Sequence, residues 1–292
     1  MSFSDSETVD IAVQPASMQV TVELGAATHA GRVRPNNEDS YLVARASRSL
    51  ETVLTNLQAG DFPVWAAERA YGLVVADGMG GHAGGEVASQ LALRAVVEHA
   101  IATADWIMRD AAAHSDRIEE RIVERFAAAN EAVLEQANQD PRLDGMGTTM
   151  TMAVSSGACL FVGHVGDSRA YLLRGGELQA LTRDHSFAQA LADSGVISRE
   201  QAAAHNLRNV LLRNLGRTAS NADVRRMFLE SGDQLLLCTD GLTDMVADRA
   251  ISRILQAAPT AQAACDQLVA AALEGGGKDN VTAVLARYAW KQ

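Results

Sequence analysis

The chain has 292 residues, with 36 Asp and Glu against 25 Lys and Arg and a formal net charge of −11. This length is enough for one large domain or two small ones. The acid excess argues against a nucleic-acid-binding surface, because contacts to phosphates use clustered Lys and Arg. The longest apolar runs, such as residues 263–273, fall short of the roughly 20 residues that cross a bilayer. Residues 1–10 lack a basic segment followed by an apolar stretch, so we expect no secretory signal.

The three cysteines, Cys159, Cys238 and Cys265, are widely spaced and contain no Cys-x-x-Cys pair. The sequence therefore predicts neither a disulfide framework nor a zinc site. Cys159 and Cys238 lie within apolar runs, where cysteine behaves as a small buried hydrophobe. This usage fits a reducing compartment, so we expect a cytoplasmic protein that does not contact membranes.

Residues 1–19 have no clear hydrophobic period, and we expect them to form a mobile tail. After this tail, short alternating or β-branched runs predict strands. These runs are 20–26, 40–44, 71–76, 148–155, 158–164, 170–173, 234–238 and 281–288. Between the second and third runs, residues 47–70 are irregular and predict a long surface excursion.

Helical spacing of apolar residues predicts helices over 86–104, 115–138, 187–215 and 261–273. Glycine-containing stretches at 155–157 and 174–176 lie between predicted strands and indicate hairpin turns. Consecutive hairpins, with helices in pairs between them, favour an α+β fold with antiparallel sheets over a doubly wound parallel sheet.

Aspartates recur beside glycine where predicted strands end. Asp77 and Asp240 each precede a glycine, and Asp167 follows one. An Asp in such a place projects its carboxylate from a rigid support, and the glycine lets the backbone approach a cation closely. A single Asp-Gly is most often only a turn. The repetition, with further acids at 37–39 and 278–280, predicts a site for hard divalent ions such as Mg²⁺ or Mn²⁺.

Seven short motifs occur along the chain in an order that is typical of one protein family. They are RPNNEDS (34–40), VADGMGGH (75–82), DGMGTT (144–149), HVGDSRAY (164–171), LTRDHS (181–186), CTDGL (238–242) and KDNVT (278–282). In these motifs the chain resembles the bacterial metal-dependent Ser/Thr protein phosphatases of type 2C, the PPM family. The resemblance covers residues 20–288, nearly the whole chain.

The resemblance implies one phosphatase domain over residues 20–290. In this domain two antiparallel sheets would stack as a sandwich, and a helix pair would cover each outer face. Residues 186–218 would form the family's flap segment beside the site. Basic residues of this segment, such as Arg208 and Arg213, would either help to recruit phosphopeptides or belong to the solvated surface.

The resemblance also implies a centre for two metal ions, Mn²⁺ or Mg²⁺, at one end of the sandwich. Asp77 would bridge the two ions, and the carbonyl oxygen of Gly78 would contact one of them. Asp240 and Asp279 would hold the first ion.

The resemblance specifies the roles of the remaining motif acids less fully. Glu38 and Asp39 would serve the second ion, directly or through water, and the sequence leaves open which of them binds directly. Asp144 matches a position that helps to hold a third, weaker ion. We expect Asp167 and the segment 184–186 to be structural rather than metal-binding.

Two residues could act on the substrate itself. Arg34 offers a planar fork that can hold two phosphate oxygens; alternatively, it is a surface residue beside Arg32. His82 could protonate the leaving alkoxide, because an unperturbed His titrates near neutral pH. Alternatively, His82 only begins the following helix, since Met79 stands where the eukaryotic pattern has its histidine.

The resemblance therefore implies a phosphatase that hydrolyses phosphoserine and phosphothreonine on proteins with a metal-activated water and without a phospho-enzyme. We expect a monomer whose partners are phosphorylated proteins, among them a bacterial Ser/Thr kinase whose action it opposes. The alternative is an inactive pseudo-phosphatase that binds phosphoproteins, which we would expect to lack Asp77, Asp240 or Asp279. A nuclease or phosphodiesterase is disfavoured because the sequence shows no basic groove signature.

Overall fold

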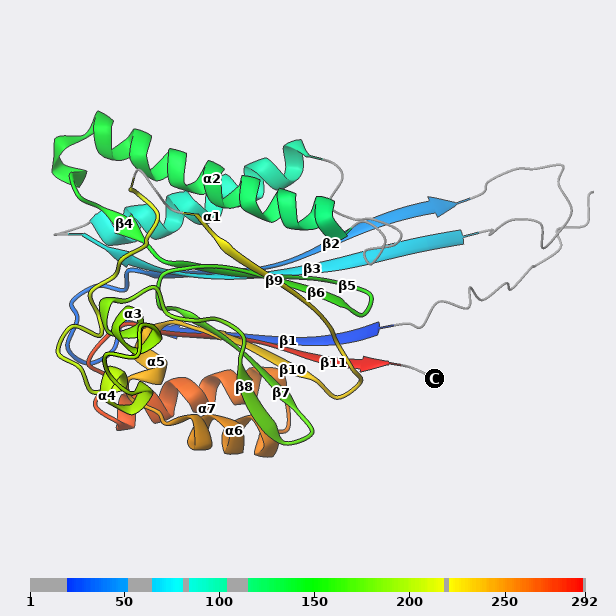
Figure 1. The fold of residues 1–292 in the computed structure, drawn as a ribbon. Coiled ribbons are helices and arrows are strands. Elements are labelled where there is room, and N and C mark those ends of the chain that lie inside the picture. The colour runs from blue at the N-terminus through cyan, green and yellow to red at the C-terminus, as the bar shows by residue number, and fades with distance from the viewer. Residues whose placement is uncertain (1–19, 52–64, 81–83, 104–114, 218–220, 291–292) are drawn as a thin grey trace, which may run out of the picture.

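The computed structural model of the chain describes residues 20–51, 65–80, 84–103, 115–217 and 221–290. Two antiparallel sheets stack face to face, and helices cover both outer faces of the sandwich (Figure 1). The predicted α+β architecture is confirmed. The tail predicted at residues 1–19 lies outside the described residues.

One sheet has the strand order β1-β11-β10-β7-β8, with antiparallel neighbours throughout. Its strands are β1 (Val20–His29), β7 (Arg169–Arg174), β8 (Glu177–Ala180), β10 (Gln234–Cys238) and β11 (Val281–Trp290). Gly175 and Gly176 connect β7 to β8 with φ of 58° and 88°. This is the backbone conformation that a two-residue hairpin turn requires, so the hairpin predicted there is confirmed.

The second sheet has the order β2-β3-β5-β6-β9, and the short strand β4 pairs with the end of β3. Its strands are β2 (Asp39–Glu51), β3 (Trp65–Met79), β4 (Gly147–Thr148), β5 (Met150–Ser156), β6 (Cys159–Val165) and β9 (Asp223–Phe228). The sequence analysis did not identify β8 or β9, which are short strands at sheet edges.

The irregular excursion predicted over residues 47–70 is wrong where the structure describes it. Strands β2 and β3 stay paired as far as Glu51 and Trp65, whereas β5 joins β3 only from Ala70 onward. The outer part of this hairpin therefore extends beyond the sheet. The expectation rested on the turn-forming residues Gly60, Asp61 and Pro63, which lie outside the described residues, and not on the paired segments beside them.

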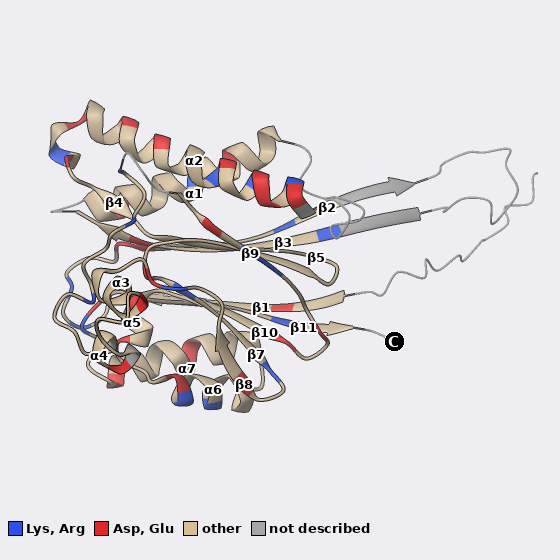
Figure 2. Cartoon of the chain, viewed as in Figure 1, with Lys and Arg blue, Asp and Glu red and all other residues tan. Residues whose placement is uncertain are grey.

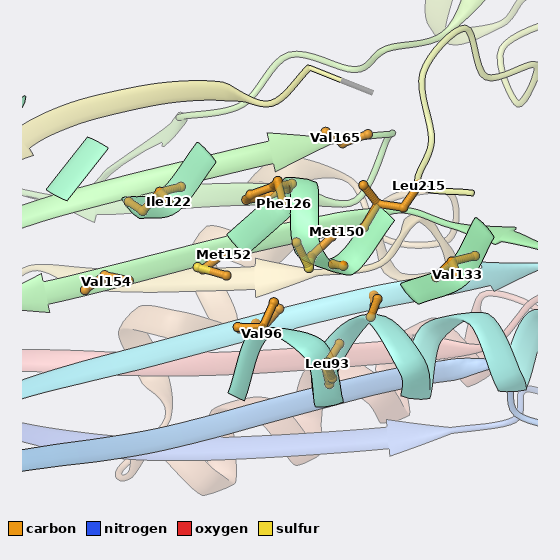
Figure 3. Packing of buried hydrophobic residues seen from close by; sticks show 14 of the residues in the cluster. Leu93, Val96, Ile122, Phe126, Val133, Met150, Met152, Val154, Val165 and Leu215 are labelled. Carbon is orange, nitrogen blue, oxygen red and sulfur yellow. The ribbon is translucent and has the colours of Figure 1, made fainter. Parts of the chain in front are cut away.

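Helices α1 (Gly84–Ala102) and α2 (Ser115–Gln139) cover the β2 sheet, and α6 (Asp248–Ala257) and α7 (Ala261–Glu274) cover the β1 sheet. Figure 3 shows side chains of α1 and α2, such as Val96 and Phe126, packed over the strands. Further apolar layers lie under α6 and α7 and between the two sheets. Fully burying a side chain such as Phe126 contributes roughly 1.5–3 kcal/mol.

Two helix predictions need correction. The helical region expected over 187–215 is two short helices, α3 (Phe187–Asp193) and α4 (Arg199–Ala203), followed by irregular chain. Gly195, with φ of 73°, follows α3, and Ser198 starts α4 with a capping box. Helix α6 was missed, although Ile251 and Leu255 on its buried face are four residues apart.

Two further short helical segments connect the strands near one end of the sandwich. They are the 3₁₀ turn η1 (Pro141–Leu143) and α5 (Asp240–Thr243). Among the described helices, none combines the length and the apolar character that a membrane crossing requires. All three cysteines are buried and form no disulfide with one another.

Candidate metal centre

Four strand ends from both sheets meet at the α5 end of the sandwich (Figure 1). In the β2 sheet, β2 begins at Asp39, which pairs in register with Asp77 of β3. In the β1 sheet, β10 ends just before Asp240, and β11 begins just after Asp279. The two sheets thus present their motif carboxylates from rigid strand ends at the same edge.

Asp39 connects the two sheets at this edge. Its Oδ2 accepts hydrogen bonds from the hydroxyls of Thr239 at 2.8 Å and Thr282 at 2.7 Å. Its Oδ1 is buried and has no hydrogen-bond partner. Burial, opposed by the two threonines and reinforced by Asp240, raises the pKa of Asp39 to about 7.

Asp240 and Asp77 share this unfavourable environment. Asp240 Oδ1 is likewise buried without a partner, and burial together with the charges of Asp244 and Asp279 raises the pKa of Asp240 to about 6. Burial, with Asp39 and Asp240 close by, raises the pKa of Asp77 well above its ordinary value. Buried carboxylates without a counter-charge are costly, and a bound cation removes that cost.

Glu38 reaches the same edge through close backbone packing. The N–H of Gly78 donates to the carbonyl oxygen of Glu38 at 3.2 Å. A Cβ added at Gly78 would overlap the Gly85 carbonyl, and one added at Gly85 would overlap the Glu38 carboxylate. Only glycine at these two positions lets β3 and the start of α1 approach Glu38 so closely.

Arg34 forms an ion pair with Asp279, with Nη2 and Oδ2 2.7 Å apart, and its side chain is 55% exposed. The segment that carries Arg34 is held by Asn280, whose Nδ2 donates to the carbonyls of Ala30 at 2.9 Å and Asn36 at 2.8 Å. Asn280 Oδ1 also accepts from the N–H of Glu38 at 2.8 Å. In this arrangement Arg34 neutralises Asp279.

The sequence analysis did not assign a role to Thr239, Thr282 or Asn280, although all three orient the acids. Their signal was present, because each stands inside a motif that was recognised, CTDGL or KDNVT. Hydroxyl and amide groups directly beside metal-site carboxylates commonly fix the orientation of those carboxylates.

The donor set fits hard divalent ions, which take carboxylate and carbonyl oxygens. Within the described part of the chain, no three His, Cys, Asp or Glu side chains converge on one ion position. Asp39 Oδ2 and Asp279 Oδ2 are turned toward Thr239, Thr282 and Arg34 instead. The unpartnered Oδ1 atoms of Asp39 and Asp240 are the atoms that a cation would satisfy, with reorientation of the neighbouring side chains.

Two residues from the sequence analysis lie apart from this buried group. Asp144 is exposed at the end of η1, where its N–H bonds to the Pro141 carbonyl. His82 lies outside the described residues. The predicted roles of both residues stay predictions.

Asp167, which the sequence analysis expected to be structural, lies within reach of the charge of Asp240. It is 8% exposed, and burial together with the charges of Asp240 and Asp184 raises its pKa. Asp184 in turn forms a two-point contact with Arg169, at 2.8 and 2.7 Å. Arg169 thus pairs with Asp184 beside the centre, in keeping with the structural role expected for the segment 184–186.

The LTRDHS motif lies beside Asp167 and is anchored through His185. The N–H of His185 donates to the Gly166 carbonyl at 2.7 Å, and Nδ1 of His185 accepts from the Gly166 N–H at 3.2 Å. Its Nε2 lies 3.1 Å from Asp223. His185 therefore connects this loop to the core, in keeping with the structural role expected for the segment 184–186.

Comparison with known proteins agrees with the motifs. The family profile described as Protein phosphatase 2C matches residues 59–285. The chain is 37% identical over 271 residues to the serine/threonine protein phosphatase PstP of Mycobacterium tuberculosis. It is 36% identical over 214 residues to the serine/threonine phosphatase stp of Listeria monocytogenes, covering 73% of this chain and 82% of that protein. The chain belongs to the protein phosphatase 2C family.

Family members differ in how much of their length this chain matches. The PstP alignment covers 93% of this chain but 46% of PstP, so the chain spans about half the length of that relative. The catalytic domain of PstP, solved in complex with 2 manganese ions, has a TM-score of 0.72 and 36% identity. That comparison covers 93% of this chain and 100% of the solved chain.

A second solved family member, Stp1 from Staphylococcus aureus, has a TM-score of 0.74 at 29% identity. The comparison covers 95% of this chain and 99% of Stp1. The protein phosphatase 2C architecture therefore extends over nearly all of this chain.

Proposed function

We propose that this chain is a metal-dependent phosphatase that hydrolyses phosphoserine and phosphothreonine on proteins. The observation that carries the proposal is the group of buried carboxylates, with unpartnered Oδ1 atoms on Asp39 and Asp240. Such a group is unfavourable unless cations neutralise it. The relatives named serine/threonine phosphatases, one of them solved with manganese, support the same activity.

Two ions, Mn²⁺ or Mg²⁺, would be held by the motif acids. Asp77 would contact both ions, and the Gly78 carbonyl would contact one of them. Asp240 and Asp279 would hold the first ion, and Glu38 and Asp39 would serve the second. A third, weaker ion would use Asp144 with Asp240. When bound, the ions supply positive charge for the phosphoryl group and lower the pKa of water.

The chain's own residues would position the substrate. Arg34 is more than half exposed, so its guanidinium can turn from Asp279 to two oxygens of the phosphoryl group. Asp279 would then lose its present counter-ion and become available to a metal ion. His82 would donate a proton to the leaving seryl or threonyl oxygen.

The substrates would be phosphorylated proteins, including a Ser/Thr kinase whose phosphorylation the enzyme reverses. We further propose that the protein acts as a monomer in the cytoplasm and binds neither nucleic acid nor membranes. Figure 2 shows acidic residues along the outer surface of α2 as well as near α5, in keeping with a surface that repels polyanions.

The test is release of phosphate from a phosphothreonine peptide by the purified protein with Mn²⁺, with EDTA, and with the Asp240→Asn variant. We expect activity that requires Mn²⁺ and that falls at least about a hundredfold in the variant, because Asp240 would be a direct ligand. Turnover that survives EDTA would contradict the metal assignment. Mn²⁺ binding without any turnover would favour the pseudo-phosphatase.

A further inference from the structure

Thr148 and Thr149, the two threonines of the DGMGTT motif, are fully buried and have no part in the proposed function. Strand β4 ends at Thr148 and β5 begins at Met150, so Thr149 interrupts the run of strands that pairs with β3. The register of β3 with β4, in which Gly78 pairs with Thr148, places Thr149 opposite Asp77. The interruption therefore lies beside the acid that would bridge the two ions.

At this point a hydroxyl takes the place of a backbone acceptor. The N–H of Thr149 donates to the carbonyl of Asp77 at 2.9 Å, as in a regular antiparallel ladder. In the opposite direction, the N–H of Asp77 donates to a side-chain atom, Oγ1 of Thr149, at 3.0 Å. The carbonyl of Thr149 accepts instead from the hydroxyl of Thr148 at 2.9 Å. One of the two hydrogen bonds that fix Asp77 against the neighbouring chain thus depends on a side chain.

Two more hydroxyls support this contact. The Thr148 hydroxyl also lies 2.8 Å from the carbonyl oxygen of Asp77, and Oγ of Ser168 lies 2.7 Å from Oγ1 of Thr149. Ser168, from the HVGDSRAY motif, is fully buried like the two threonines. A Cβ at Gly166 would overlap the Thr149 side chain, so glycine there lets this motif approach closely. Thr148, Thr149 and Ser168 together form a buried hydroxyl cluster behind Asp77.

The carboxylate of Asp77 needs such support, because its surroundings repel it. Asp39, Asp240 and Asp279 all place charge of the same sign close to Asp77, so a displacement that separates the carboxylates is favourable in the metal-free protein. Without the Thr149 hydroxyl, the Asp77 N–H would also be buried without an acceptor. Because an unpaired buried N–H is costly, the end of β3 would shift until that N–H found a new partner.

We propose that Thr149 is a positioning residue for the metal centre: its hydroxyl, supported by Thr148 and Ser168, holds the backbone of Asp77 so that two ions can share the carboxylate. This inference rests on the proposed function, because it assumes ions at Asp77. A ligand that is fixed before the ion arrives loses less conformational freedom on binding. The hydroxyl cluster therefore raises the affinity of the centre for its ions.

Thr149→Val tests this proposal, because valine keeps the shape of threonine and lacks the hydroxyl. We expect its Mn²⁺ affinity, measured by calorimetric titration of the purified protein, to fall roughly tenfold to a hundredfold. Thr149→Ser keeps the hydroxyl and should bind Mn²⁺ within about threefold of wild type. At Mn²⁺ concentrations that fill the centre, Thr149→Val should recover most of its turnover of a phosphothreonine peptide, since no group that contacts the substrate has changed.

Thr182→Val is the matched control. The N–H of Ala170 in β7 donates to Oγ1 of Thr182 at 3.1 Å, so this variant loses the same kind of hydrogen bond in the other sheet. Ala170 carries no group that could bind a metal ion. We expect both valine variants to lower the unfolding temperature of the metal-free protein, whereas only Thr149→Val should weaken Mn²⁺ binding. This difference separates positioning of Asp77 from a general loss of stability.

Three results would overturn the inference while leaving the proposed function intact. They are a wild-type Mn²⁺ affinity in Thr149→Val, an equal loss of affinity in Thr182→Val, and a loss in Thr149→Ser as large as in Thr149→Val. If the wild-type protein bound no Mn²⁺ at all, the proposed function and this inference would both be wrong.

Ser168→Ala decides the question if Thr149→Val does not fold. This variant leaves Thr149 in place and removes the hydroxyl that supports it at 2.7 Å. We expect a loss of Mn²⁺ affinity that is smaller than a direct loss of the Thr149 hydroxyl would give. An affinity equal to that of the wild-type protein would overturn the inference.

Discussion

The two ends of strand β10 carry aspartates whose buried carboxylate oxygens are in opposite situations. Asp233 precedes the strand, and its carboxylate accepts from Arg174 at 2.9 and 2.6 Å and from the N–H of Glu230 at 2.7 Å. Asp240 follows the strand, and its Oδ1 is buried with no partner. The two residues are seven positions apart and joined by the same apolar strand, Gln234–Cys238.

The contrast shows how to separate a structural acid from a cation-binding one. Asp233 has a guanidinium fork as its counter-ion, so its burial is compensated within the protein. Asp240 lies beside Asp244 and Asp279, which add charge of the same sign, and its hydrogen bond with Asp77 and the charge of Arg169 offset them only in part. A buried carboxylate that its own protein does not neutralise indicates a site for an external cation.

The largest expected effect on folding stability comes from adding Mn²⁺, which would bind at the Asp240 end of β10 and not at the Asp233 end. At a free concentration about a hundredfold above its dissociation constant, the ion should stabilise the folded protein by about 2.7 kcal/mol. Thermal unfolding with Mn²⁺ and with EDTA would measure this. If the unfolding temperature does not respond to Mn²⁺, Asp240 is no more a cation-binding residue than Asp233.

Asp233→Asn should lower stability by about 2 kcal/mol, because Arg174 loses the buried one of its two charged partners and keeps only the exposed Glu230. The loss should be the same with Mn²⁺ and with EDTA, since Asp233 takes no part in the metal centre. Urea unfolding in both conditions would test this. A loss that appears only with Mn²⁺ would mean that the two ends are coupled.

Asp240→Asn should raise the stability of the metal-free protein, in contrast to Asp233→Asn. Because burial and like charges raise the pKa of Asp240 to about 6, its ionised form destabilises the folded state above that pH. The amide should therefore stabilise the metal-free protein at pH 7.5 by about 1.5 kcal/mol. The same variant should lose most of the stabilisation by Mn²⁺. A metal-free variant less stable than wild type would contradict the unfavourable environment of this carboxylate.

The smallest expected effect concerns His185, a buried residue at the metal end of the sandwich whose ring nitrogens both have hydrogen-bond partners. Burial lowers its pKa, and its Nδ1 already accepts the Gly166 N–H at 3.2 Å. The unfolded chain binds a proton more readily, so the stability from neutral His185 is present above pH 6.5 and is lost as the pH falls.

Between pH 7.5 and 5.5 the stability advantage of wild type over His185→Gln should shrink by about 1 kcal/mol. Urea unfolding of both proteins at the two pH values gives the difference, and other titrating groups cancel in it. An advantage that stays constant with pH would mean that the pKa of His185 is the same in the folded and unfolded states.

Much of the fold could be read from residue patterns. The predicted strands at 234–238 and 281–288 correspond to β10 and β11, and the helix predicted at 115–138 corresponds to α2. These elements bury one face or both, so their hydrophobic period is strong. The edge strands β8 and β9 contain no fully buried residue, and they were missed for that reason.

By itself, the sequence determined which residue types the site would contain. Asp-Gly at the ends of apolar strands and the order of seven motifs indicated the family and the acids of the centre. These signals are local, because strand, turn and carboxylate lie within a few residues of one another.

Only the tertiary structure decided how those acids are paired. It brings Asp39 of one sheet against Thr239 and Thr282 of the other, more than 150 residues away, and it leaves Oδ1 of Asp39 and Asp240 without a partner. It also gives Asp233 a guanidinium and sets the hydroxyl of Thr149 against the N–H of Asp77. Burial and pairing depend on residues far apart in the chain, so no local pattern can report them.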